Sequence, residues 1–259
     1  MEQNTNNQKT PFFRFFELWF QNFWMLVPIN FVCCVIGTLL IPHGLSQAGI
    51  TNVARNLARD RHSFGISDFF DTIKANWKQS LIVGIINLLV TALLCYGLFF
   101  YYNAQGLFAD IALGFVLICF VVFSFMGYYM WTMIITFDLP TAKVYKNSFL
   151  LAFVNFKNNL FVGVVQLALY AGVILSVILI PHYMVLFLAT LLTVFVLPGF
   201  IHLLIQFNCF SAIAKYMIDP YYEANPGEDI LLRRSLSLET KEQPEEKQAP
   251  VFHDENEPQ

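Results

Sequence analysis

The stretch FFDTIKANWKQSLIVGIINL, Phe69–Leu88, joins an amphipathic segment to an uncharged apolar segment without a break. Its first half places large apolar residues, such as Phe69, Ile73 and Trp77, on one side of a helix and charged residues elsewhere. Its second half carries no charge. A helix that lies in the membrane interface and then enters the bilayer has this pattern. The stretch therefore predicts an interfacial helix that leads into a membrane span.

The same plan returns 79 residues later, over Phe149–Leu167, and more faintly near the N-terminus. The shared pattern is a phenylalanine followed six residues later by an asparagine and an aromatic residue. Its three copies are Phe16, Asn22 and Phe23; Phe70, Asn76 and Trp77; and Phe149, Asn155 and Phe156. Self-similarity at a fixed spacing is typical of internal repeats. We therefore expect repeated helical hairpins, in which Asn76 and Asn155 fix the bend from interfacial helix to span.

The composition indicates an integral membrane protein. Of 259 residues, 57% are hydrophobic and only 13% are charged, and the mean hydropathy is +0.56. Soluble domains ordinarily contain about 25% charged residues. The chain has no basic face of the kind that binds nucleic acid, so this class of partner is not expected. The composition and the repeat together predict an all-α, polytopic transmembrane helical bundle.

Apolar segments long enough to cross about 30 Å of hydrocarbon recur along the chain. They are residues 19–41, 81–102, 109–137, 160–180 and 183–205, and together with the loops they make up a membrane domain over residues 11–218. We expect Pro198 and Gly199 to bend the last of these spans. Residues 44–59 are too few to cross alone, and we interpret them as a short return helix sheltered by its neighbours. The chain would then have six membrane segments, and without this helix it would have five.

The basic residues indicate the orientation. With the return helix of residues 44–59, all 15 Lys and Arg residues fall on one side of the membrane, which the positive-inside rule makes cytoplasmic. Both termini are then cytoplasmic, whereas the five-span alternative puts the N-terminus outside. Residues 1–10 are polar, and residues 219–259 hold 11 of the 18 acidic side chains. We expect both of these terminal segments to be disordered.

Three stretches carry a family resemblance. They are FFRFFELWFQNFWMLVPINFVCC at residues 12–34, NVARNLARD at 52–60 and FFDTIKANWKQS at 69–80. These stretches resemble the YesL-like family of bacterial integral membrane proteins, a domain of unknown function, over about residues 12–215. The resemblance implies a bacterial cytoplasmic membrane location and a loose link to carbohydrate uptake and utilisation. It assigns no role to any residue.

Four polar residues within the predicted spans are candidate ligand contacts. Asn87 and Gln166 each follow a repeat asparagine by eleven residues, so they could meet as a substrate site where two repeats pack together. They could equally form interhelical hydrogen bonds worth about 1 kcal/mol. His202 and Gln206 lie one helical turn apart and either line a cavity or sit at the interface. No Asp, Glu, Lys or Arg lies in the middle of a span, which disfavours an ion-coupled pump.

Two further features point to lipids or to protein partners. The basic residues near the predicted cytoplasmic face could bind anionic lipid or an acidic partner segment, or could act as topology determinants alone. They are Arg55, Arg59, Arg61, Lys74 and Lys78. Small residues at four-residue spacing, Ala168, Gly172 and Ser176, predict close helix packing, either inside the protein or in a homo-oligomer.

No sequence motif for catalysis, metal binding or cofactor binding is found, so we assign no catalytic, metal or cofactor residue. We expect a non-enzymatic accessory or partner-binding component, with membrane lipids and a sugar-transport system or another membrane protein as partners. The alternative is a small-solute permease or channel that uses the interface between repeats. A lipid-acting membrane enzyme is a third, disfavoured hypothesis because the chain lacks an acid–base constellation.

Overall fold

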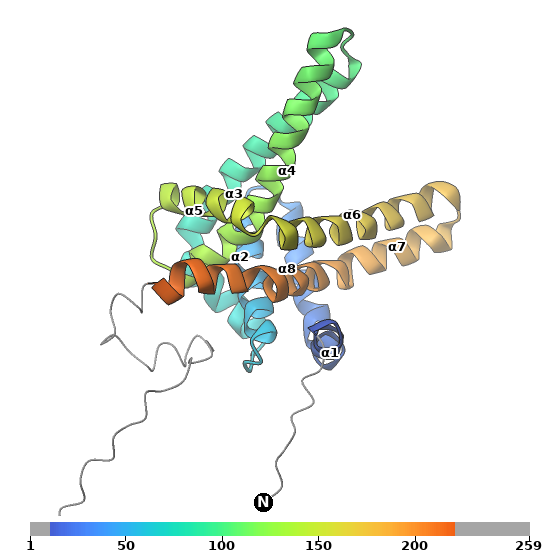
Figure 1. Ribbon diagram of the computed structural model, residues 1–259. Helices are drawn as coiled ribbons and strands as arrows, with labels where there is room; N and C mark the ends of the chain where they lie inside the picture. The colour runs from blue at the N-terminus through green and yellow to red at the C-terminus, as the bar shows by residue number, and fades with distance from the viewer. Residues whose placement is uncertain (1–10, 221–259) are drawn as a thin grey trace, which may run out of the picture.

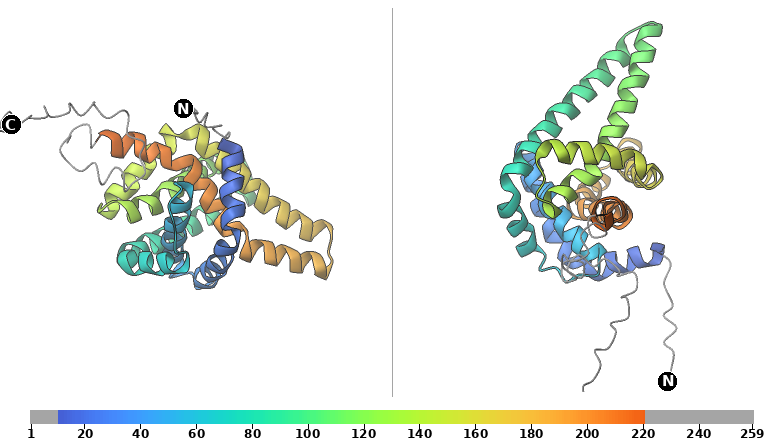
Figure 2. Two further views of the ribbon diagram at one scale, coloured as in Figure 1. Left: turned by 90° about the horizontal axis from the view of Figure 1, so that it is seen from below. Right: turned by 60° about the vertical axis from the view of Figure 1, so that its left-hand side comes forward.

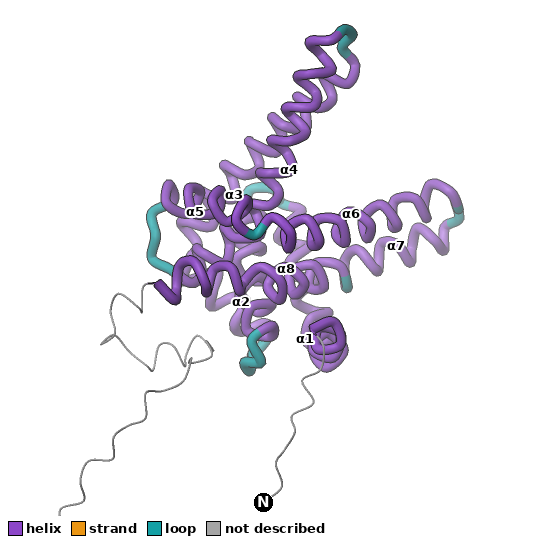
Figure 3. Tube along the Cα trace, viewed as in Figure 1, coloured by secondary structure: helices purple, strands orange, loops and turns teal. Residues whose placement is uncertain are grey.

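The computed structural model describes residues 11–220, and these residues form helices joined by short loops. The elements are α1 (Pro11–Thr38), α2 (His43–Ala58), α3 (Ile66–Asn103), α4 (Leu107–Thr136), α5 (Thr141–Val154), α6 (Phe156–Leu179), α7 (Tyr183–Phe195), α8 (Leu197–Ile213) and a π-helical turn, η1 (Ala214–Ile218). No strand occurs among the described residues (Figure 3). The predicted all-α fold is therefore confirmed. The two terminal segments predicted to be disordered lie outside the described residues, apart from Asp219 and Pro220, which continue the last helix.

Two helical hairpins project in different directions from a common base (Figure 1). One hairpin consists of α3 and α4, and the other consists of α6 and α7; a second viewpoint shows the same divergence (Figure 2). The base is formed by α2, α5, α8 and the lower parts of α3 and α4. The most apolar 18-residue windows of α4 and α6 are each only 6% buried. The hairpins thus present apolar surface outward, as helices in contact with lipid do.

Five helical segments are long and apolar enough to cross a membrane. They are Phe12–Thr38, Ile66–Asn103, Leu107–Thr136, Phe156–Leu179 and Leu197–Ile218. The α7 helix is apolar as well, but with 13 residues it is shorter than these. The chain is therefore a multi-pass membrane protein by the length and composition of its helices.

The segment predicted over residues 183–205, with a bend at Pro198 and Gly199, consists of two helices, because the chain breaks at Val196 between α7 and α8. Pro198 lies in the first turn of α8, where its missing N–H group removes no helical hydrogen bond. The break frees carbonyl groups at the end of α7. The Nδ2 amide of Asn30, on α1, donates to the Phe195 carbonyl oxygen at 2.7 Å and so replaces a lost partner.

The bend predicted at Asn76 is not observed. The α3 helix runs unbroken through Asn76, whose Nδ2 donates to the Thr72 carbonyl of the same helix at 3.1 Å. In α1, Asn22 likewise donates to the Leu18 carbonyl of its own helix at 2.9 Å. An amide that is satisfied inside its own helix leaves the helical hydrogen bonds intact, so neither residue produces a bend.

The third repeat asparagine does lie at a helix break. Asn155 separates α5 from α6, and its Nδ2 donates to the Tyr129 hydroxyl at 2.9 Å. The carbonyl freed at the end of α5, that of Ala152, accepts instead from Asn159 Nδ2 at 2.9 Å. Asn159 was not singled out by the sequence analysis, and it holds this junction together.

The α2 helix crosses α3 with almost no side chain between the two backbones. A Cβ atom added to Gly44 would lie 2.2 Å from the Ser80 carbonyl oxygen and 2.8 Å from Gly84 Cα. The predicted return helix of residues 44–59 is thus observed as α2, which packs against α1, α3, α4 and α8. The close crossing fixes α2 in the base, beneath the point where the hairpins diverge.

Candidate functional site

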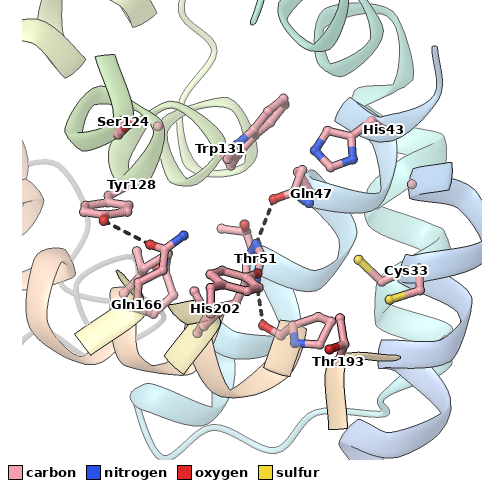
Figure 4. Close-up of a pocket in the computed structure, with 18 of the residues that line it drawn as sticks. Cys33, His43, Gln47, Thr51, Ser124, Tyr128, Trp131, Gln166, Thr193 and His202 are labelled. Atoms are coloured by element: carbon pink, nitrogen blue, oxygen red, sulfur yellow. Dashed lines mark hydrogen bonds between the residues drawn. The ribbon is translucent and has the colours of Figure 1, made fainter. Parts of the chain in front are cut away.

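A cavity of about 590 Å³ lies where the two hairpins leave the base. Six helices line it: α1, α2, α4, α6, α7 and α8. The polar side chains of its lining include His43, Gln47, Thr51, Tyr128, Gln166, His202 and Gln206, several of which are drawn in Figure 4. The cavity is within the usual size range for small-molecule sites, about 300–1,000 Å³.

The lining contains no Asp, Glu, Lys or Arg among the described residues. Its polar groups are amides, hydroxyls, imidazoles and thiols, all of which can be neutral near pH 7. A buried ligand charge would need a counter-charge, because an unpaired ion is costly in a medium of low dielectric. The site is therefore suited to an uncharged ligand that forms hydrogen bonds.

The floor of the cavity is organised by His202 on α8. Its Nδ1 lies 2.8 Å from the Pro198 carbonyl oxygen, and its Nε2 lies 3.0 Å from the Gln47 amide on α2 (Figure 4). A neutral imidazole has one N–H donor and one acceptor nitrogen. Both partners are oxygen atoms, the Pro198 carbonyl and Gln47 Oε1, so the tautomer of His202 decides which of the two accepts its N–H. His202 thus orients Gln47.

Gln206 lies one turn beyond His202 and is 3% exposed. Its Nε2 donates to the Thr132 hydroxyl at 2.8 Å, whereas its Oε1 is buried and has no hydrogen-bond partner among the described residues. An unsatisfied buried acceptor costs about 1–3 kcal/mol. Gln206 is thus a cavity-lining side chain whose polar atoms are only partly satisfied by the surrounding helices.

The opposite wall is closed by a hydrogen bond between the two hairpins. The Tyr128 hydroxyl on α4 donates to Gln166 Oε1 on α6 at 3.0 Å, as the dashed line in Figure 4 shows. Ser124 and Gly127 lie beside Tyr128 in the lining. This hydrogen bond is the polar contact that marks the edge of the cavity between α4 and α6.

The structure brings together three of the four polar residues that the sequence analysis singled out. Gln166, His202 and Gln206 line the cavity, but Asn87 does not. The Oδ1 of Asn87 accepts from the Tyr145 hydroxyl at 2.7 Å, so this residue links α3 to α5. Asn87 and Gln166 therefore do not share a site.

The sequence analysis missed the contribution of α2. His43, Gln47 and Thr51 follow one another at four-residue spacing and all line the cavity. Because residues four apart lie on the same side of a helix, this spacing was a signal available in the sequence. Tyr128 gave no comparable signal, because it lies in an aromatic-rich run with a second tyrosine, Tyr129, and a tryptophan, Trp131.

The predicted basic cluster is divided between half-buried and exposed positions. Arg55 donates to the Thr136 hydroxyl at 2.6 Å, which ties α2 to α4. The guanidinium group of Arg59 lies 4.0 Å from the centre of the Phe210 ring, and burial together with Arg55 and Arg61 lowers its pKa to about 9. The Lys74 side chain on α3 is 78% exposed.

Lys78, also on α3, is exposed and lies over the Trp77 ring. The arginines with described contacts therefore serve packing inside the base, while the two lysines are free to meet lipid or a partner. Within residues 11–220, no three His, Cys, Asp or Glu side chains are close enough together to hold a metal ion.

Residues 18–98 match the family described as "Protein of unknown function, DUF624". The matched segment runs from α1 through α2 into the outer part of α3, so it includes the Gln47 wall of the cavity but not α4, α6, α7 or α8. No curated protein and no solved structure matches the chain. The YesL-like resemblance, the link to carbohydrate and the internal repeat remain predictions.

Proposed function

We propose that the protein is a permease-type membrane protein that takes up a small uncharged, hydroxyl-rich solute in the polar cavity. The observation that supports this proposal is the cavity itself, which is lined by hydrogen-bonding groups without charge in a membrane protein. Polar groups inside a membrane domain are costly and often mark a substrate path. No chemical reaction of the solute forms part of the proposal.

The polar groups exceed what helix packing requires. If they served only as interhelical links, their hydrogen bonds would be made within the protein. Gln206 Oε1 instead has no partner among the described residues, and a void of about 590 Å³ separates helices that could otherwise have packed together. A ligand with several hydroxyl groups would fill the void and hydrogen-bond to the polar side chains that line it.

A sugar or polyol has this character, in keeping with the carbohydrate link that the YesL-like resemblance implies. Within this proposal, the protein lies in the bacterial cytoplasmic membrane with both termini in the cytoplasm. The two closed hairpin ends then face outward, and the base lies near the inner side.

The proposal is tested by equilibrium binding to the protein in lipid nanodiscs. Radiolabelled neutral sugars and polyols are compared with charged relatives, such as glucuronate and glucosamine. We expect at least one neutral compound to bind and its charged relatives to bind at least tenfold more weakly, because the lining supplies no counter-charge. The absence of binding by every neutral compound, or equal binding by the charged ones, would overturn the proposal.

A matched pair of variants then locates the bound solute. Gln206→Leu removes an amide that lines the cavity, and Asn87→Leu removes an amide that lies outside it. We expect the first change to weaken binding about tenfold, equivalent to about 1.4 kcal/mol, and the second to leave affinity within about twofold. Equal effects would contradict the assignment of the cavity.

A second function, partner binding, is favoured by the N-terminal part of α3. There Phe70 and Trp77 are 39% and 50% exposed next to the exposed Lys74 and Lys78. This combination suits an acidic segment of a sugar-transport subunit or another membrane protein. Crosslinking in native membranes tests it: a stoichiometric partner should be recovered with the wild type and lost with K74E/K78E. Recovery of the same partner by both proteins would contradict this role for α3.

A further inference from the structure

A second, apolar groove of about 330 Å³ adjoins the polar cavity between α4 and α6. The two spaces share four lining residues, namely Ser124, Tyr128, Gln166 and Tyr170. The rest of the groove is lined by apolar side chains and one glycine, Gly163. The polar cavity and the apolar groove therefore lie side by side and share one boundary, formed by these four residues.

Three of the four shared residues make hydrogen bonds within the protein. Tyr128 and Gln166 hydrogen-bond to each other at 3.0 Å across the junction. The Ser124 hydroxyl donates to the Phe120 carbonyl of its own helix at 2.8 Å. These hydrogen bonds satisfy the Ser124 and Tyr128 hydroxyl donors that border the groove, which leaves an apolar channel beyond the junction.

The groove opens sideways, toward the place that lipid would occupy. Its walls α4 and α6 belong to different hairpins, which diverge away from the base (Figure 1). Its lining residues Leu160 and Leu167 are 46% and 70% exposed. A hydrocarbon chain can therefore enter from the bilayer without crossing any polar surface.

Building on the proposed function, we infer that the ligand is a non-ionic amphiphile, with its hydroxylated head group in the polar cavity and a hydrocarbon chain in the α4–α6 groove. A free sugar would leave the groove without an apolar occupant. An ordinary phospholipid carries a phosphate, and the cavity lining holds no Lys or Arg to pair with it. A neutral glycolipid meets both requirements.

The test measures lipid retention by native mass spectrometry of the full-length protein released from nanodiscs. The nanodiscs contain phosphatidylglycerol with a small fraction of monoglucosyl and diglucosyl diacylglycerol. We expect the wild type to retain one glycolipid in preference to phosphatidylglycerol. Binding of free methyl glucoside and methyl maltoside is measured in parallel, because these compounds carry the head groups without the chains.

Three variants separate a groove site from general lipid contact. Gly163→Leu and Val164→Trp each place bulk in the groove, and a Cβ atom at Gly163 already meets the Phe125 ring at 3.1 Å. Gly172→Leu is the control, because nothing lies within 4 Å of a Cβ atom at this α6 position. We expect glycolipid retention to fall about tenfold in both groove variants and to persist in the control. Val164→Trp keeps the test valid if Gly163→Leu does not fold.

Each other outcome overturns the inference. Equal retention by all four proteins would show surface-bound lipid only. Binding of a free methyl glycoside without glycolipid retention would overturn the inference and leave the proposed solute site intact. Failure of both classes of probe would overturn the inference and count against the proposed function as well.

Discussion

The chain continues as one helix through Asn76 but breaks at Asn155, although the two regions share a sequence pattern. The difference lies four residues further on, where the first region has Ser80 and the second has Asn159. Asn159 Nδ2 donates to the Ala152 carbonyl at 2.9 Å, and its Oδ1 accepts from the Tyr129 hydroxyl at 2.5 Å. Ser80 Oγ is buried and has no partner among the described residues.

From this comparison we infer that a helix in a membrane domain breaks where a side chain can replace the backbone hydrogen bonds that the break removes. Backbone groups cannot turn to water inside a bilayer, so an amide from the chain must serve. The hairpin of α6 and α7 has such a break at each end. Asn159 supplies the amide at the Asn155 break, and Asn30 supplies it at the Val196 break. The hairpin of α3 and α4 enters the base through continuous helices, and α3 is pressed there against Gly44 of α2.

The largest effect is expected where the continuous helix meets α2. In Gly44→Val, the new side chain meets a backbone oxygen within 2.2 Å of its Cβ, and this oxygen cannot move aside without shifting α3. We expect a loss of about 3 kcal/mol in the free energy of unfolding, measured by unfolding in mixed detergent–SDS micelles. Gly114→Val on α4 is the control, since a Cβ atom there has no neighbour within 4 Å. Equal stability of the two variants would refute the close crossing.

The next largest effect is expected at the α5–α6 break. Asn159→Leu leaves the Ala152 carbonyl and the Tyr129 hydroxyl without this partner. Because each buried unsatisfied group costs about 1–3 kcal/mol, we expect a loss of about 2–3 kcal/mol. Ser80→Ala, at the matching position of α3, removes a buried hydroxyl that has no partner among the described residues, and should stabilise the protein by about 1 kcal/mol. A larger loss of stability in Ser80→Ala than in Asn159→Leu would contradict this explanation of the break.

A smaller effect is expected at the α7–α8 break. Asn30→Ala removes the donor to the Phe195 carbonyl and also removes an Oδ1 that is already unpaired, so part of the loss is offset. We expect a net loss of about 1–2 kcal/mol and faster hydrogen exchange at residues 193–200. Asn103→Ala, whose amide bonds only within the exposed end of α3, should leave this exchange unchanged. Protection that stays at the wild-type level in Asn30→Ala would mean that other groups hold the break.

The smallest effect is expected where the two hairpins touch. Tyr128→Phe deletes the hydroxyl that donates to Gln166 and keeps the ring in place. Interhelical hydrogen bonds of this kind average about 0.6 kcal/mol, and we expect a loss of that size by the same unfolding assay. A loss above about 2 kcal/mol would mean that this bond, and not the base, determines how the hairpins lie.

Most of the helices could be predicted from the sequence, because long apolar segments can satisfy their backbone in a membrane only as helices. The breaks could not be predicted, since Asn22, Asn76 and Asn155 look alike locally and only Asn155 meets Tyr129 from another helix. Likewise, polar residues in spans could be recognised as unusual. Whether such a residue lines a cavity, as Gln206 does, or ties two helices together, as Asn87 does, depends on tertiary contacts.

The basic residues illustrate the same limit. Sequence proximity suggested one surface formed by Arg55, Arg59 and Lys74. The hydroxyl that Arg55 binds belongs to Thr136, 81 positions away, and the ring beneath Arg59 belongs to Phe210 on α8. The Lys74 ammonium group lies 3.6 Å from a carboxylate oxygen of its helical neighbour Asp71. Which basic side chains remain exposed to a partner therefore depends on which of them make contacts inside the fold.

The central claim, that an uncharged polar ligand occupies the cavity, is tested most directly by native cysteines. Cys34 lines the cavity, whereas Cys95 is exposed on α3 outside it. The measurement is the alkylation rate of each thiol, resolved by mass spectrometry, with and without the neutral sugar or glycolipid that binds most tightly. A ligand above its Kd occupies most of the protein, so we predict that it slows the alkylation of Cys34 at least about threefold. The alkylation rate of Cys95 should stay unchanged. Equal rates at Cys34 with and without saturating ligand would contradict the account.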